Sequence, residues 1–123
     1  MDEKSKMVLI DKIRKWMQTT LKDSTMDRAA WADADELVKS KVLEGATRDE
    51  VTKLLGIGAR CGANRYTSNG EEHYTFQSFG FGPNDIYYSV GRIPIGWVGG
   101  VPTIIFGFDK DGKCSKIKVV HTQ

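Results

Sequence analysis

The sequence of 123 residues lacks a long apolar run and a strong charge of either sign, and each absence excludes a class of function. No window approaches the roughly 18 apolar residues that a membrane-spanning helix needs, and no apolar segment follows the first lysines as it would in a signal peptide. We therefore expect that membrane anchoring would need a segment that these residues do not contain. A net charge of +2 is too small for the concentrated basic stripe that binds phosphates, so we expect no nucleic acid as a partner.

Residues that carry chemistry are also few. His73 and His121 are the only histidines, and their spacing from the two cysteines matches no compact metal-binding pattern. Glu71 and Glu72 are adjacent, so in a strand they would point to opposite faces, which suits no acid–base pair. No nucleophile has a convincing base nearby. The sequence therefore predicts a protein that is not an enzyme and that uses no metal and no cofactor.

The N-terminal half of the sequence has the apolar spacing of helices. Residues 4–21 predict an amphipathic helix, with one apolar face that we expect to pack on its own domain. The residues of that face are Leu9, Ile13, Trp16, Met17 and Leu21. A second helix is expected from about Met26, after a turn at residues 23–25.

Residues 35–58 predict the end of this second helix, a third helix and the turn between them. Gly45 breaks the second helix. Thr47 and Glu50 have the spacing of a capping box. In this arrangement the threonine hydroxyl accepts a hydrogen bond from the backbone amide of the glutamate, and the glutamate carboxylate accepts one from the backbone amide of the threonine. Gly56 is placed to end the third helix. The result is a helical hairpin with one apolar side.

Beyond Gly58 the apolar period changes from helical to alternating, which predicts strands. The residues that share a face are Ile86, Tyr88 and Val90 in the first strand, Ile104, Phe106 and Phe108 in the second, and Ile117 and Val119 in the third. Asp111-Gly112 predicts a tight turn between the last two strands. We therefore expect a two-layer α+β fold, with the helical hairpin and the N-terminal helix on one face of an antiparallel β-meander.

The length suits one hydrophobic core, so residues 1–123 predict a single domain. Its expected parts are the N-terminal amphipathic helix at 1–22, the helical hairpin at 26–56, an insertion at 59–83 and the β-meander at 84–121.

The insertion is rich in aromatic residues. Asn69-Gly70 predicts a hairpin turn within it. A second irregular segment, Gly91–Pro102, is apolar and glycine-rich; it either exposes its tryptophan or folds back over a sheet edge. Large apolar side chains on such segments often mark a contact surface. The candidate protein-binding residues are Tyr74, Phe76, Phe79, Phe81 and Trp97.

Four segments carry a resemblance to a known family: Leu43–Gly45, Ala46–Gly56, Tyr87–Gly91 and Ile104–Lys113. They resemble the pattern of the BamE/SmpA-like, β-lactamase-inhibitor-protein-like superfamily of small bacterial envelope domains, over about residues 28–120. The matched residues are mainly caps, turns and core positions, so the resemblance describes a fold. Two departures are the absence of a lipobox and the replacement of a common proline by Ile57.

The resemblance implies a non-catalytic protein-binding or scaffold domain of the bacterial cell envelope, with another protein as its partner. A cytoplasmic location is the alternative. Two other functions stay open: a small-ligand carrier, in which the insertion closes a pocket over the sheet, and an inhibitor of a secreted hydrolase.

In an exported domain, Cys61 and Cys114 invite a disulfide, which would stabilise the fold by about 4 kcal/mol. Strand alternation places Cys114 with Lys116 and Lys118 on the face away from the helices. A bridge would therefore require the insertion to fold around to that outer face. An insertion so placed would also cover Tyr87, Ile105 and Val120. Two free thiols are the alternative.

Overall fold

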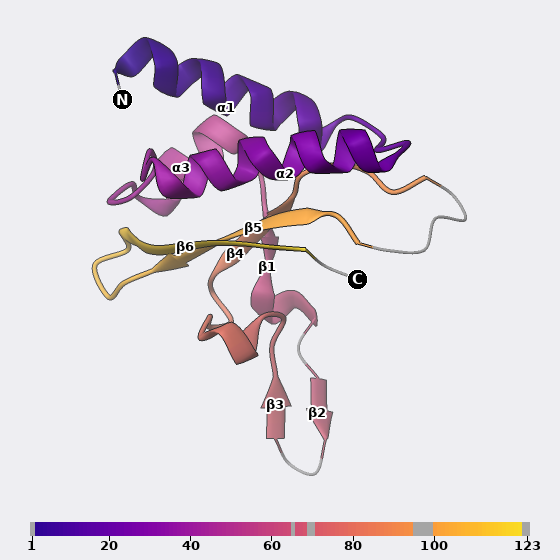
Figure 1. Cartoon of the computed structure of the whole chain (residues 1–123). Helices are drawn as coiled ribbons and strands as arrows, with labels where there is room; N and C mark the ends of the chain where they lie inside the picture. Colours follow the sequence, from indigo (N-terminus) through magenta and orange to yellow (C-terminus); the bar gives the residue numbers. More distant parts are fainter. Residues whose placement is uncertain (1, 65, 69–70, 95–99, 122–123) are drawn as a thin grey trace.

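The computed structural model describes residues 2–64, 66–68, 71–94 and 100–121, and it confirms the predicted α+β fold. Three helices, α1 (Glu3–Met17), α2 (Ser24–Lys39) and α3 (Arg48–Leu55), lie on one face of an antiparallel sheet (Figure 1). The strands of this sheet are β1 (Ala59–Arg60), β4 (Ile86–Ser89), β5 (Pro102–Phe108) and β6 (Cys114–His121), in the spatial order β1-β4-β5-β6. In the described part of the chain, no helix has both the length and the apolar character needed to cross a bilayer.

The first two helices begin at aspartate caps. The Asp2 carboxylate accepts from the Ser5 amide at 2.8 Å, and the Asp23 carboxylate accepts from the Met26 amide at 2.8 Å. Because Asp23 is the cap, α2 starts at Ser24, two residues before the predicted start. Helix α1 is shorter than predicted, since it ends at Met17.

The predicted third helix is confirmed at both ends. The Thr47 hydroxyl accepts from the Glu50 amide at 3.2 Å and donates to the Glu50 carboxylate at 3.2 Å, whereas the capping box predicts the Thr47 amide as donor to that carboxylate. Gly56, with φ of +90°, follows the last residue of α3. Helix α2 ends earlier than predicted, at Lys39, and Lys41 already has φ of +56°.

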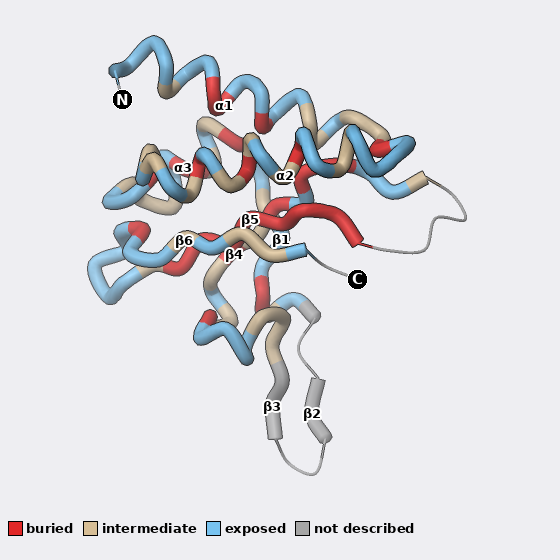
Figure 2. The backbone as a smooth tube through the Cα atoms, viewed as in Figure 1, coloured by how far each residue is buried: buried red, intermediate tan, exposed pale blue. Residues whose placement is uncertain are grey.

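The apolar sides of the helices meet the sheet in one core, which we call the inner cluster. Figure 2 shows its buried positions gathered between the helical layer and the sheet. Its buried members are Leu9, Ile10, Ile13, Leu21, Ala30, Ala34, Leu37, Leu43, Val51, Leu55, Ile86, Tyr88, Val90, Val101, Ile104, Phe106 and Cys114. The apolar faces predicted for the helices and for the three strands contribute to it, and Ile10 joins them although the pattern did not predict it.

The sheet differs from the predicted meander in two ways. The start of the insertion supplies a fourth strand, β1, in which Ala59 pairs with Tyr87. A β-bulge interrupts the pairing of β5 with β6 between Gly107 and Phe108. Because a bulge shifts the alternation of side chains, Cys114 belongs to the inner cluster and not, as predicted, to the outer face with the lysines.

The insertion covers the outer face of the sheet. Strands β2 (Tyr66–Ser68) and β3 (Glu71–His73) form the predicted hairpin, which points away from the sheet in Figure 1; its turn, Asn69-Gly70, lies outside the described residues. Below the sheet, the insertion packs in what we call the outer cluster. This cluster consists of buried Cys61, Phe81 and Ile105, with Phe76, Tyr87 and Val120 packed against it.

Candidate functional site

The structure gives the aromatic residues of the insertion different roles. Phe81 is only 3% exposed and packs in the outer cluster with Ile105, so it is a core residue and not, as predicted, a contact residue. The physical reason is that β5 is apolar on both faces, and its outer face needs a cover. Phe76 is half-buried and meets Tyr87 edge to face, with ring centroids 5.1 Å apart.

Phe79 is the predicted contact residue that the structure exposes most clearly. Its side chain is 43% exposed, and the Lys118 Nζ lies 5.3 Å from its ring centroid. The Lys116 ammonium donates to the Phe79 carbonyl. Tyr74 is half-buried, and Trp97 lies outside the described residues. The aromatic insertion therefore acts largely as a cover for the sheet.

The two cysteines are free and buried, and they belong to different clusters. Cys61 is in the outer cluster and Cys114 in the inner cluster. Burial raises the pKa of each thiol to about 11. Because only the thiolate is a good nucleophile or metal ligand, both side chains are inert near neutral pH. Of the two alternatives that the sequence leaves open, the structure has free thiols.

The two histidines lie far apart in the fold, and neither belongs to a cluster of metal-ligating side chains in the described part of the chain. Among the described residues, no group of three His, Cys, Asp or Glu side chains could hold a metal ion. His73 belongs to β3, on the insertion, and His121 ends β6.

The feature that the sequence did not predict is an open sheet edge at β6. Strand β6 is last in the strand order, so among the strands of the described chain it has one neighbour, β5. The Pro102 carbonyl accepts from the Val90 amide at 2.7 Å, so Pro102, and Ile104 two residues later, turn their backbone groups toward β4. Val119 lies opposite Ile104, and in an antiparallel ladder it must then turn its own N–H and C=O away from β5. The same alternation applies to Ile117.

The chain itself closes the beginning of this edge. The Gly45 amide donates to the Cys114 carbonyl at 2.8 Å, and the Cys114 amide donates to the Ala46 carbonyl at 2.7 Å. Thr47 and Lys113 form an antiparallel bridge. The segment between α2 and α3 thus pairs with the beginning of β6 through an isolated antiparallel bridge and two backbone hydrogen bonds.

The other end of the edge is tied to α2. His121 Nε2 lies 3.0 Å from Asp27 Oδ1, and the His121 ring lies against Trp31, with centroids 6.1 Å apart. Between the paired start of the edge and this side-chain contact, the backbone groups of Ile117 and Val119 have no partner in the described part of the chain. The open part of the edge therefore begins after Cys114 and extends to the His121 side-chain contact with α2.

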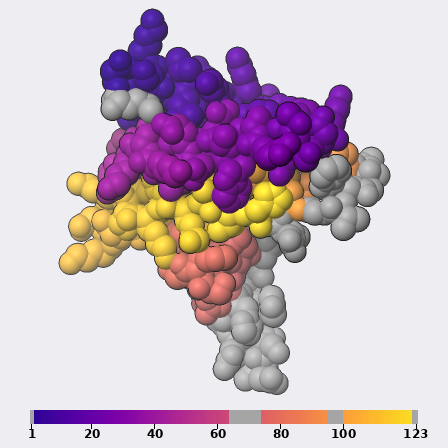
Figure 3. Space-filling view, viewed as in Figure 1, coloured from indigo at the N-terminus to yellow at the C-terminus, as the bar shows by residue number. Residues whose placement is uncertain are grey.

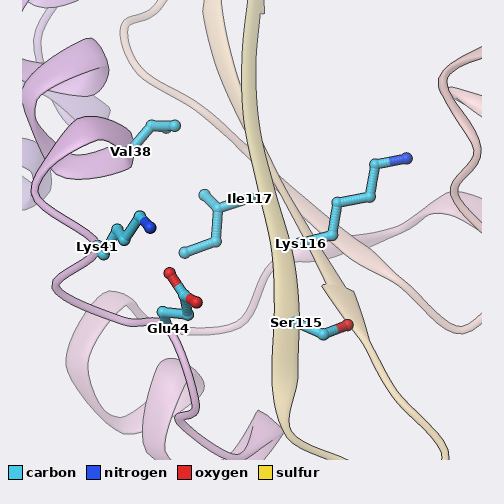
Figure 4. A pocket seen from close by; sticks show the side chains of 6 residues that line it. All are labelled: Val38, Lys41, Glu44, Ser115, Lys116 and Ile117. Atoms are coloured by element: carbon cyan, nitrogen blue, oxygen red, sulfur yellow. The ribbon is translucent and has the colours of Figure 1, made fainter.

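A pocket of about 350 Å³ lies beside this open part, between the end of α2 and β6. It is lined by Val38, Lys41, Glu44, Ser115, Lys116 and Ile117. Figure 4 shows the Ile117 side chain pointing toward the residues of α2 and its following turn, while Lys116 points to the opposite side of the strand. In Figure 3, β6 forms a yellow band that is open to the surface between the helices and the insertion.

Positive charge dominates around the edge. Lys41, Lys116 and Lys118 are all exposed there, against Glu44. At the far end of the edge, the Asp27 carboxylate contacts His121. A strand that lies along this edge would therefore meet more lysine than carboxylate.

Sequence reasoning missed this site because an edge is a property of strand order, which depends on contacts between distant residues. One signal was present. Lys116 and Lys118 alternate with Ile117 and Val119, and lysine is common on strands at the edge of a sheet.

Comparison with known proteins identifies no relative. No protein-family model, no curated protein and no solved structure matches this chain.

Proposed function

We propose that this protein is a non-catalytic protein-binding domain that receives an extended segment of its partner as an added strand along β6. The observation that carries the proposal is the pair of outward-facing backbone positions, Ile117 and Val119. They lie between the paired start of the edge and the His121 side-chain contact with α2. Strand addition of this kind uses main-chain hydrogen bonds for affinity and side-chain pockets for specificity.

The energetics fit a weak, reversible complex. The N–H and C=O groups of the two positions offer four hydrogen bonds, each worth about 1 kcal/mol net. One aliphatic side chain in the adjacent pocket adds about 2 kcal/mol when it is buried. The gross gain is therefore about 6 kcal/mol, and the loss of translational and rotational freedom opposes it. A single short segment should bind no more tightly than about tens of micromolar.

The cell-envelope location is part of the proposal and rests on the resemblance of residues 28–120 alone. Proteins of one fold take up unrelated functions, so the resemblance supports a compartment and not a particular partner. Fractionation of cells that express the complete gene tests this part: recovery in the envelope fraction agrees with it, and recovery in the cytosol contradicts it.

The two other functions have less support. The carrier function needs a pocket between insertion and sheet, but Phe81 and Ile105 pack against each other in that interface. The inhibitor function rests only on the resemblance.

The test begins by attaching a photoreactive amino acid at Ser115, which lines the pocket, to identify the partner in host cells. Partner affinity is then compared for two variants of Val119. Val119→Pro removes an amide that takes no part in the ladder with β5, whereas Val119→Thr keeps the amide and the branched shape. We expect proline to weaken binding at least about tenfold and threonine by less than about threefold.

Thermal unfolding of both variants provides the control for folding. Equal affinity of the well-folded proline and threonine variants would contradict strand addition at β6.

A further inference from the structure

We propose that the strand bound at β6 alternates acidic with apolar side chains, an inference that rests on the strand addition proposed above. Successive side chains of any added strand point to opposite faces of the sheet. At this edge, the two faces differ in charge and in apolar character, so they select different residues.

The outer row of the edge is basic. Lys116 Nζ lies 4.5 Å from the Phe81 ring centroid, and Lys118 Nζ lies 5.3 Å from that of Phe79. Both ammonium groups are therefore held on the outer face, above the insertion, while their side chains stay exposed. Residues directly opposite each other on neighbouring strands attract when their charges differ and repel when they are alike. The partner residues opposite these two lysines should be aspartate or glutamate.

The inner row is apolar. Ile117 and Val119 are half-buried on the helical side and pack against the inner cluster. Val38 of α2 lines the pocket beside them, and the charges at its mouth, Lys41 and Glu44, are of opposite sign. This side therefore favours a branched apolar side chain and makes little selection by charge.

A second copy of the chain fits this edge less well. When two β6 strands pair in antiparallel orientation about Lys118, the two Lys118 side chains lie opposite each other, and pairing about Ile117 places Lys116 opposite Lys118. Like charges in these positions destabilise the pair. In these two registers, the lysines that attract an acidic strand oppose pairing between two copies. Pairing about Val119 instead places Lys118 opposite Val120, which supplies no opposite charge.

The test uses three blocked peptides, each about seven residues long, as is typical of a strand. Valine alternates with glutamate in the first, with lysine in the second and with serine in the third. Binding to the full chain is measured by fluorescence anisotropy, and amide hydrogen exchange at Ile117 and Val119 locates the bound peptide. We expect the glutamate peptide to bind about tenfold more tightly than the lysine peptide, and the preference to weaken at high salt.

Charge-reversed variants test the cause of the preference. Lys118→Glu should weaken the glutamate peptide and strengthen the lysine peptide, each about threefold or more. Lys110→Glu is the matched control. Lys110 is exposed in the turn between β5 and β6, so its substitution makes the same change of charge at a position away from the open edge. It should leave both affinities within about twofold.

The possible results separate the inference from the proposed function. If the lysine or serine peptide binds as well as the glutamate peptide and protects the same amides, the acidic pattern is wrong while strand addition stands. If no peptide slows exchange at Ile117 and Val119, strand addition itself is wrong. If these amides become protected as protein concentration rises without peptide, the occupant is a second copy and the inference is overturned.

Discussion

Replacing Phe81 with alanine should destabilise this protein far more than the same change at Phe79. The two phenylalanines are two residues apart in the insertion, and both are predicted from the sequence to be contact residues. In the structure, Phe81 is 3% exposed beside Ile105, whereas Phe79 is 43% exposed. Comparing the two substitutions therefore shows whether the insertion stabilises the fold as a cover of the sheet or forms an exposed contact surface.

The expected magnitude follows from burial. Truncation of a buried phenylalanine to alanine lowers the free energy of unfolding by about 3–5 kcal/mol. The outer cluster is small, so we expect a loss at the low end of this range, about 3 kcal/mol, for Phe81→Ala. For a domain of this length, that loss corresponds to a fall in melting temperature of about 12 °C. Phe79→Ala should cost less than about 1 kcal/mol, since nearly half of the side chain is already in water.

Urea unfolding followed by tryptophan fluorescence and by circular dichroism measures both values. The comparison requires that the slope of unfolding with urea stays the same, so that a change in midpoint reports stability. Equal losses at the two positions, or a loss at Phe81 below about 1 kcal/mol, would refute the packing of the insertion on the sheet.

Three further predictions concern local features of the fold. Thr47→Ala removes the cap of α3 and should cost about 1 kcal/mol by urea unfolding, whereas Thr47→Ser should restore most of it; an unchanged alanine variant would contradict the cap. Cys61 and Cys114 should not react with Ellman's reagent at pH 8 until guanidinium unfolds the chain, and rapid labelling of the native protein would contradict their burial. Burial raises the pKa of each thiol from 9.0 to about 11, so the unfolded chain loses these protons first as the pH rises. The free energy of unfolding should therefore be unaffected by the thiols below pH 9 and decline as the pH rises toward 11. Gly91→Ala should destabilise by about 2 kcal/mol or more, because φ is +136° and an added Cβ would lie 2.5 Å from Leu21; a neutral change in melting temperature would contradict that approach.

Local signals in the sequence predicted the helices and the inner faces of the strands. The predicted cap at Thr47 and the predicted helix end at Gly56 are both confirmed, because caps and helix stops depend on residues within one or two turns. Alternation at Ile104 and Phe106 predicted the buried side of β5 for the same reason. The predicted helix ends differ from the observed ones by a few residues. Helix α1 ends at Met17, although the apolar spacing that predicted the helix continues into the following segment.

Features that depend on distant contacts were not predictable in this way. Because of the bulge beside Gly107, Cys114 lies on the inner face of the sheet and not on the predicted outer face. No pattern in the strand sequence predicts this bulge. Strand β1 has only two residues, too few to show alternation. One signal was present but unused: Ile104 and Ile105 are adjacent and both apolar, which predicts a strand buried on both faces and hence a cover for its outer side.

The open edge itself is the central claim, and amide hydrogen exchange of the free protein tests it most directly. Lys118 pairs with Ile105 and turns its amide toward β5, whereas the amides of Ile117 and Val119 point to solvent. We therefore expect Lys118 to exchange slowly and both neighbours to exchange fast, with their exchange slowing only when the glutamate–valine peptide is added. Slow exchange at Ile117 and Val119 in the free, monomeric protein would contradict an open edge.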